Sequence, residues 1–213
     1  MIFDEGHYVP WRAARLAVVK DAYGSLAGKR VLELGCGLGH VGRELASWGA
    51  DVTVSDARQE YVAEALRRGC KKGVVYDVEQ PWPDELGDGW DLIIHWGLLY
   101  HTVDLRAALQ CVTRAKETCL ECEVCDSDHP DAICEVPEYQ GGDQAAGSHQ
   151  RGRRPSASMI ERLLDELGVG WARLDSPRLN AAFHRYDWEC TNHSPAAGWE
   201  PGLRRFWFVA RDG

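Results

Sequence analysis

The sequence predicts an α/β fold in which a parallel sheet is covered by helices on both faces. Short continuous apolar segments, such as 30–34 and 90–95, alternate with segments of helical periodicity, such as 40–48. Strands that are apolar throughout are typical of a parallel sheet buried on both sides. The 213 residues contain no repeat and no linker, so one domain spanning 1–213 is expected.

Helices are expected where apolar residues recur every three to four positions. Gly49 and Gly69 follow two of these segments, and glycine commonly ends a helix. Asp104 is a suitable N-terminal cap, and Ser158 with Glu161 has the spacing of a capping box. The expected helices are 11–26, 40–48, 59–68, 104–114 and one that begins near Ser158 and ends at Gly168.

Strands are expected where short apolar segments stand between helices. They are 30–34, 51–56, 73–77, 90–95 and 119–125, followed by two closing strands at 170–175 and 205–210. Two long segments, 127–155 and 177–203, fit no regular element. Because long loops in a compact domain are usually functional or mobile, we expect these two insertions to form a lid over an acceptor.

Composition excludes several classes of protein. The net charge of −9 argues against a nucleic-acid partner, since such proteins usually present a basic face. No apolar segment approaches the ~20 residues of a membrane span, and the first residues do not resemble a signal peptide, so a cytoplasmic protein is expected. Cys119, Cys122 and Cys125 have cluster-like spacing, but on a strand the first two point to opposite faces, so no metal is expected.

The strongest motif runs from Glu33 through Gly35, Gly37 and Gly39, between a predicted strand and a predicted helix. Such glycines allow a tight turn and a close approach of a ligand to the backbone. Asp56 ends the next predicted strand, where a carboxylate can accept hydrogen bonds from both hydroxyls of a ribose. The G-x-G-x-x-G spacing of dinucleotide enzymes is not met, because His40 stands one position after the third glycine.

On these residues, together with Asp77 after the third strand, the chain resembles class I S-adenosylmethionine-dependent methyltransferases over nearly its whole length. The resemblance implies a Rossmann-like, seven-stranded, mostly parallel sheet whose last strand is antiparallel. It also implies S-adenosylmethionine as cofactor, with Asp56 on the ribose and with Asp77 and Val78 at the adenine. The remaining cofactor-binding residues expected are Glu33, Gly35, Cys36, Gly37, Gly39, Ala57, His95, Trp96 and Tyr100.

The residues 97–101 and the pair Pro155-Ser156 are also similar to a subgroup that includes tRNA wobble-uridine carboxymethyltransferases. This similarity keeps a tRNA-modifying enzyme as an alternative, and a non-catalytic S-adenosylmethionine-binding regulatory protein is a second one. The preferred hypothesis is O-methylation of a small polar metabolite or sugar. His101 and His184 are the candidate general bases, because removing a hydroxyl proton assists O-methylation.

Overall fold

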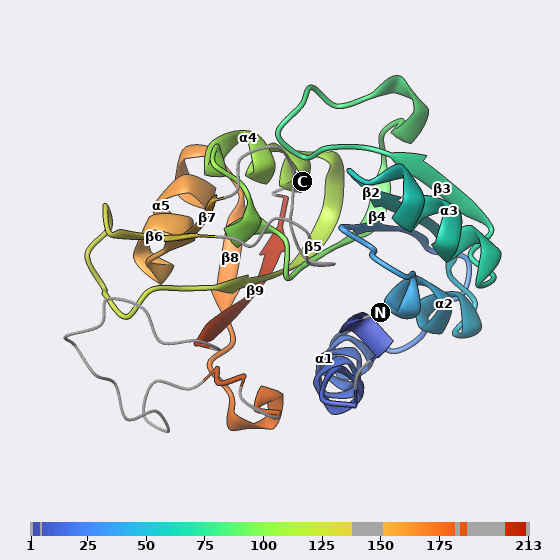
Figure 1. Ribbon diagram of the computed structural model, residues 1–213, viewed down its shortest axis with the longest axis horizontal. Helices are drawn as coiled ribbons and strands as arrows, with labels where there is room; N and C mark the ends of the chain where they lie inside the picture. The colour runs from blue at the N-terminus through green and yellow to red at the C-terminus, as the bar shows by residue number, and fades with distance from the viewer. Residues whose placement is uncertain (1, 5, 138–150, 182–183, 187–202, 212–213) are drawn as a thin grey trace.

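The computed structural model describes residues 2–4, 6–137, 151–181, 184–186 and 203–211 (Figure 1). Its centre is a seven-stranded sheet in the order β3-β2-β1-β4-β5-β9-β8. The strands are β1 (Arg30–Leu34), β2 (Asp51–Asp56), β3 (Lys72–Val75), β4 (Trp90–Trp96), β5 (Ala115–Glu123), β8 (Gly170–Arg173) and β9 (Arg204–Ala210). β1 to β5 run parallel, and β9 is antiparallel to both of its neighbours. The predicted fold class is therefore confirmed.

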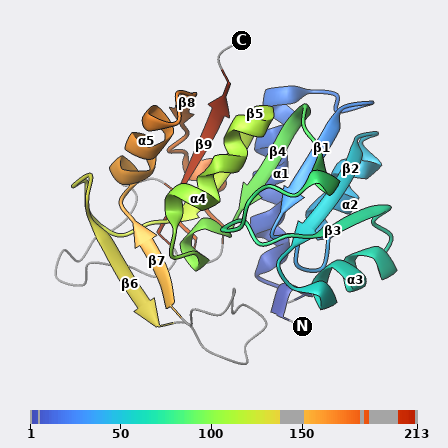
Figure 2. The ribbon, with the colours of Figure 1, turned by 90° about the horizontal axis from the view of Figure 1, so that it is seen from above.

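Helices cover both faces of this sheet (Figure 2). Side chains from α1 (Tyr8–Tyr23) and α2 (His40–Ser47) pack into one apolar cluster, together with Ala65 from α3 (Gln59–Arg67). Side chains from α4 (Leu105–Leu109) and α5 (Ala157–Glu166) pack into the cluster on the opposite face. The strands carry apolar side chains on both faces, and the helices bury these side chains from water on both sides of the sheet.

Short 3-10 helices connect these elements, at Ile2–Asp4, Asp84–Leu86, Leu99–His101, Gln110–Arg114 and Pro177–Leu179. The predicted helix over 104–114 is accordingly divided, with α4 ending at Leu109. Within the described residues, no helix has both the length and the apolar character needed to cross a membrane.

The helix near Ser158 begins earlier than predicted. The hydroxyl of Ser156 accepts a hydrogen bond from the backbone N–H of Met159 at 3.0 Å, so Ser156 is the cap and α5 starts at Ala157. Ser158 lies inside the first turn. Ser156 and Ser158 are both of a residue type that caps helices. Ser156 is the cap because its backbone, directly after Pro155, is extended, as is typical of an N-cap residue.

The sequence predicts no regular structure in the segment 127–155, and that prediction is wrong for residues 133–137 and 151–155. β6 (Ile133–Pro137) and β7 (Arg151–Pro155) form a separate antiparallel pair, which lies beside the main sheet close to α5 (Figures 1 and 2). Glu135 stands opposite Arg153 in this pair, and their side chains form an ion pair at 3.4 Å. Residues 138–150, 182–183 and 187–202 lie outside the described residues, so the predicted lid stays a prediction.

The cysteines of β5 point to opposite faces, as their spacing predicts. Cys119 is buried in the cluster on the α1 side, and Cys122 is buried in the cluster on the α5 side. Cys125 follows the end of the strand. The described ranges contain no group of three His, Cys, Asp or Glu side chains arranged to hold a metal ion.

Candidate active site

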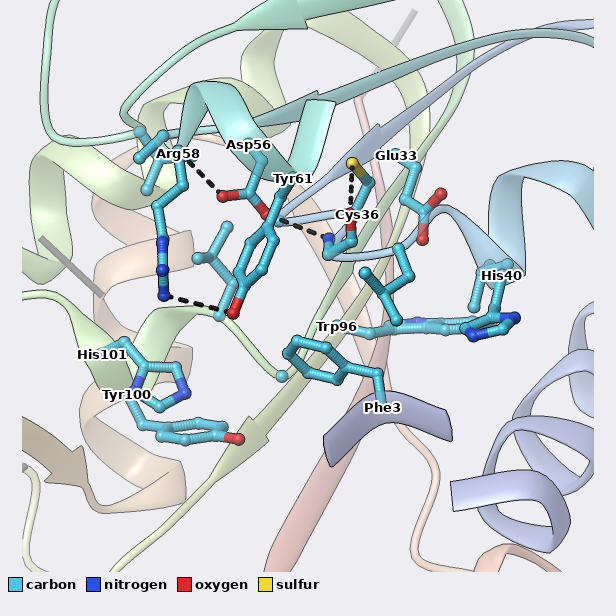
Figure 3. Close-up of a pocket in the computed structure, with 18 of the residues that line it drawn as sticks. Phe3, Glu33, Cys36, His40, Asp56, Arg58, Tyr61, Trp96, Tyr100 and His101 are labelled. Atoms are coloured by element: carbon cyan, nitrogen blue, oxygen red, sulfur yellow. Dashed lines mark hydrogen bonds between the residues drawn. The ribbon is translucent and has the colours of Figure 1, made fainter. Parts of the chain in front are cut away.

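A pocket lies beyond the C-terminal ends of the parallel strands (Figure 3). In open α/β sheets this edge is where ligands bind, because the loops that leave neighbouring strands meet there. Its wall is formed by the turn after β1, the ends of β2, β3 and β4, and one face of α1. The lining residues predicted from sequence are Glu33, Gly35, Cys36, Gly37, Asp56, Ala57, Asp77, Val78, Trp96, Tyr100 and His101.

The glycine turn has the backbone geometry that its motif predicts. Gly35 and Gly37 have φ angles of 64° and 50°, in the left-handed region that favours glycine. The backbone N–H of Cys36 donates to the carbonyl of Ser55 at 2.9 Å, which ties the turn to β2. Gly39 does not line the pocket. A Cβ there would come within 2.7 Å of the Cys70 sulfur, so this glycine permits packing rather than ligand contact.

Asp56 is held at the end of β2 by two backbone donors. Its carboxylate oxygens accept hydrogen bonds from the N–H groups of Gly37 and Arg58, each at 3.0 Å (Figure 3). Burial raises the pKa of this carboxyl above its ordinary value, while the two backbone bonds act in the opposite direction. Each carboxylate oxygen has a second lone pair, so Asp56 can also accept from two hydroxyls of a ligand.

Asp77 lies just beyond β3, in a short turn. Its side chain accepts from the backbone N–H of Glu79 at 3.0 Å. The carboxylate of Glu79 in turn accepts from the N–H groups of Val103 and Asp104, at 2.9 and 2.7 Å. Glu79 therefore joins the loop after β3 to the segment after β4, and it lines the pocket itself. The sequence contains it beside Asp77 and Val78, but its spacing alone predicts no role.

Of the residues at the end of β4, the structure brings Trp96, Tyr100 and His101 to the pocket but not His95. Successive residues of a strand point to opposite faces, so His95 and Trp96 cannot both face the ligand. His95 is fully buried, and burial lowers its pKa to about 4. Figure 3 shows Tyr100 and His101 across the pocket from Asp56.

His184 is also absent from the pocket wall. Its imidazole stacks on the indole of Trp11, with ring centroids 3.9 Å apart and planes inclined by 12°. Burial, together with the nearby cations Arg204 and Arg15, lowers its pKa to about 2. The arrangement favours a packing role for His184. Of the two histidines predicted as bases, only His101 reaches the pocket.

Residues 8–191 match the model of a family described as a methyltransferase domain. The chain belongs to the methyltransferase domain family. The resemblance to class I S-adenosylmethionine-dependent methyltransferases, which the sequence motifs indicate, is thus confirmed for the family and the fold.

Curated relatives match over part of their length. The chain is 32% identical to a ubiquinone biosynthesis O-methyltransferase of Bordetella pertussis over 108 residues, which are 48% of this chain and 44% of that protein. A protein of the same name from Aeromonas salmonicida is 30% identical over 115 residues, which are 51% and 48% of the two chains. The chain thus spans about half the length of these relatives.

Solved structures share the fold at low identity. Magnesium protoporphyrin IX methyltransferase from Synechocystis PCC 6803, crystallised with S-adenosylmethionine, has a TM-score of 0.60 and 18% identity, over 95% of this chain and 79% of that one. The N-terminal domain of EvdMO1, crystallised with S-adenosylhomocysteine and D-fucose, has a TM-score of 0.66 and 19% identity, over 99% and 84%.

The sequence motifs of this methyltransferase domain did not predict that its N-terminal segment lines the pocket. Four residues on one face of α1, namely Tyr8, Trp11, Arg12 and Arg15, line the pocket. Phe3 covers the glycine turn, with its ring 3.2 Å from the position that a Cβ on Gly37 would take (Figure 3). The spacing 8, 11, 12 and 15 was visible in the sequence. However, it is also the spacing of an ordinary core stripe.

A buried network of charges underlies the pocket where β4 and β5 end. Glu121, on β5, is fully buried and accepts a hydrogen bond from Arg204 at 2.8 Å. Arg15 approaches the other oxygen of the same carboxylate at 3.4 Å. The hydroxyl of Tyr186 donates to Glu121 at 3.2 Å and accepts from the indole N–H of Trp11 at 2.8 Å. The network therefore fixes α1 against the end of the sheet.

The arginines at the end of the first insertion, 127–155, pair with acidic residues. Arg154 forms an ion pair with Glu123 at 3.1 Å, and its guanidinium lies 4.8 Å from the centre of the Tyr100 ring. Arg153 pairs with Glu135 and donates to the carbonyl of Val103 at 2.7 Å. These contacts tie β7 to β5 and to the segment after β4.

Proposed function

We propose that the chain is an S-adenosylmethionine-dependent methyltransferase that methylates an oxygen of a small polar molecule. The observation that carries this proposal is Asp56, a buried carboxylate held by Gly37 and Arg58 at the end of β2 beside the glycine turn. Membership of the methyltransferase family supports the reaction class. The relatives that methylate oxygen in ubiquinone biosynthesis support the acceptor atom.

The residues of this pocket fit the donor. Asp56 accepts from the ribose hydroxyls, and Asp77 with the backbone of Val78 faces the adenine. Gly35 and Gly37 have no side chains, so the rest of the donor can lie close to the backbone of the 35–37 turn, beside the ring of Phe3. Ala57 adds a small apolar contact beside the ribose, and Glu33 lies under the turn. When bound, the donor supplies a methyl group on a positively charged sulfur.

The protein contributes to catalysis mainly by aligning the acceptor with the donor methyl group, because the sulfur of a sulfonium already leaves readily. A pocket that holds the acceptor oxygen in line with the methyl carbon and the sulfur avoids much of the entropic cost of the reaction. His101 is the residue in position to accept the hydroxyl proton. Tyr100 and Trp96 provide a firm aromatic wall beside it.

The experiment is methyl transfer from labelled S-adenosylmethionine to a panel of small hydroxyl, amine and thiol acceptors, with products located by mass spectrometry. The proposal expects label on an oxygen of a small acceptor. Transfer to amines only would contradict the proposed atom. Binding of S-adenosylhomocysteine without transfer to any acceptor, in the panel or in a metabolite extract, would favour the non-catalytic alternative.

A further inference from the structure

One carboxylate oxygen of Glu79 holds two successive backbone N–H groups of another loop. Its Oε1 accepts hydrogen bonds from Val103 at 2.9 Å and from Asp104 at 2.7 Å. The side chain is half-buried and lines the pocket. Hydrogen bonds to a carboxylate are stronger than those between neutral groups, so these two bonds hold the backbone at 103–104 firmly. The proposed donor contacts do not use Glu79, so its bonds require a separate explanation.

The backbone held by Glu79 leads directly to His101, the proposed base. His101 ends a single 3-10 turn, and its N–H donates to the carbonyl of Leu98 at 2.9 Å. The next residue, Thr102, is buried, and its hydroxyl and its N–H both donate to the carbonyl of Leu99, at 2.7 and 3.1 Å. These bonds join the turn into one unit, so a shift of the residue that follows it moves His101 as well.

Val103, which follows this turn, is held from two sides. Glu79 accepts from its N–H, and Arg153 of β7 donates to its carbonyl at 2.7 Å. After it, the side chain of Asp104 caps α4. Without the Glu79 carboxylate the segment would remain attached at Arg153 and at α4, but the peptide between them could turn. The expected result is a displaced His101 in a folded protein.

Glu79 is also joined to the adenine end of the pocket. Its backbone N–H donates to the carboxylate of Asp77 at 3.0 Å, and Asp77 with Val78 is proposed to face the adenine. The contacts thus run from the adenine end of the pocket through Glu79 to His101. A bound donor and a correctly placed base therefore share one support.

We propose that Glu79 is a positioning residue that holds His101 in place to accept the proton of the acceptor hydroxyl. The proposal rests on the proposed function, in which His101 is the base. Glu79 acts on His101 through the backbone at 103–104 and transfers no proton itself. Misplacing a reacting group by about 1 Å can slow an enzyme about 10²-fold, so the effect of Glu79 on turnover is large enough to measure.

Three substitutions of Glu79 and one control separate this role from a general effect on stability. Glu79→Ala and Glu79→Met remove the acceptor oxygens, and methionine keeps most of the side-chain length. Glu79→Gln is the conservative variant, because its amide oxygen can accept from the same two N–H groups. Asp91→Ala is the matched control, since Asp91 also accepts from a backbone N–H, that of Arg30 at 2.9 Å, at the start of β4 and away from the pocket. Thermal unfolding and calorimetry with S-adenosylhomocysteine are recorded for every variant.

The first readout follows His101 itself by NMR and needs no acceptor. The eight histidines are isotope-labelled in their rings, and the signal that is missing from His101→Gln identifies His101. With S-adenosylhomocysteine bound, Glu79→Ala and Glu79→Met should move this signal by more than its linewidth or broaden it. Glu79→Gln and Asp91→Ala should leave it in place. An unmoved signal in both Glu79→Ala and Glu79→Met would overturn the proposal.

The second readout is a double-mutant cycle on the turnover number, measured with the hydroxyl acceptor that the panel identifies and with S-adenosylmethionine at saturation. Glu79→Ala should lower kcat by about 10–10²-fold and leave KM for S-adenosylmethionine within a few-fold, and Glu79→Gln should recover most of the loss. In a His101→Gln background, Glu79→Ala should have almost no further effect, because its action passes through His101. Equal losses in both backgrounds, or a loss confined to donor affinity, would overturn the proposal.

Failure of the proposed function would give a different result. If wild type methylated no acceptor, that function would fail, while the His101 signal would still decide whether Glu79 places the imidazole. Loss of folding in both Glu79→Ala and Glu79→Met would assign Glu79 to the stability of the fold and overturn the positioning role.

Discussion

The carboxyl group of Glu33, at the end of β1, accepts a hydrogen bond from the backbone N–H of Gly42 in α2, with 2.8 Å between oxygen and nitrogen. A Cβ on Gly42 would come within 2.7 Å of the same oxygen, so the two residues are closely fitted. Burial raises the pKa of Glu33 to about 8, and the nearby Asp56 contributes in the same direction. In the free protein at neutral pH this carboxyl therefore holds a proton.

Stability should consequently fall as the pH rises. The unfolded chain loses the Glu33 proton near its ordinary pKa of 4.5, whereas the folded chain keeps it up to about 8. Between these values the folded state binds more protons, so each pH unit costs about 1.4 kcal/mol of unfolding free energy. Urea titrations from pH 5 to 9 should show wild type losing stability relative to Glu33→Gln, with the difference levelling above pH 8. Parallel pH profiles for the two proteins would contradict the raised pKa.

Gly39→Ala should destabilise the fold through packing as well as backbone strain. Gly39 has a φ of +69°, and an added Cβ would meet the Cys70 sulfur at 2.7 Å and the Ala65 Cβ at 2.8 Å. Gly168 has nearly the same φ, +70°, but its Cβ would meet nothing within 4 Å. Gly168→Ala is therefore a control for strain alone. We expect Gly39→Ala to cost about 1–3 kcal/mol more than the control in chemical unfolding. Equal costs would show that α2 and α3 adjust freely.

His101 and His184 should behave differently when they are replaced. His101→Gln removes a group that lines the pocket, so the turnover number for a hydroxyl acceptor should fall by about 10²–10⁴-fold. His184→Phe keeps an aromatic ring against Trp11 and should leave turnover within a few-fold. Steady-state kinetics with a common acceptor compare the two. A larger loss in His184→Phe than in His101→Gln would reverse the roles.

His184→Phe should also make the protein less sensitive to acid. Burial holds the folded pKa of His184 near 2, far below its ordinary value of 6.5. Below pH 6.5 the unfolded chain therefore binds a proton that the folded chain does not, which costs about 1.4 kcal/mol per pH unit. Unfolding free energies at pH 7, 6 and 5 should show wild type losing stability relative to the variant. A constant difference would indicate a histidine that is not buried as described.

The order of the main elements follows from the sequence because buried parallel strands and capped helices leave clear local signals. The glycine turn, Asp56 and Asp77 could be placed for the same reason, since each directly follows a strand. Which residues of β4 face the ligand could not be predicted in this way. Both faces of the strand are buried, so His95 and Trp96 differ in no local pattern, and only the packing of the sheet separates them.

The α1 face and the β6–β7 pair were missed for other physical reasons. Tyr8, Trp11, Arg12 and Arg15 have the spacing of a helix that packs on a core, and only the tertiary structure shows that this face borders a pocket. β7 reads Arg-Gly-Arg-Arg-Pro, which has no strand-like alternation. It forms a strand by pairing with β6, and its arginines also pair with Glu135 and Glu123 on neighbouring segments.

The central claim is that the pocket binds S-adenosylmethionine through Asp56, and calorimetry with S-adenosylhomocysteine tests it most directly. Wild type should bind, and Asp56→Asn should bind at least ten-fold more weakly, because hydrogen bonds to a charged acceptor are worth about 1.5–3 kcal/mol each. Asp51→Asn is the matched control, since Asp51 lies at the opposite end of the same strand, exposed and paired with Lys72. Its affinity should equal that of wild type. Equal affinity in Asp56→Asn and wild type would remove Asp56 from the site and contradict the account.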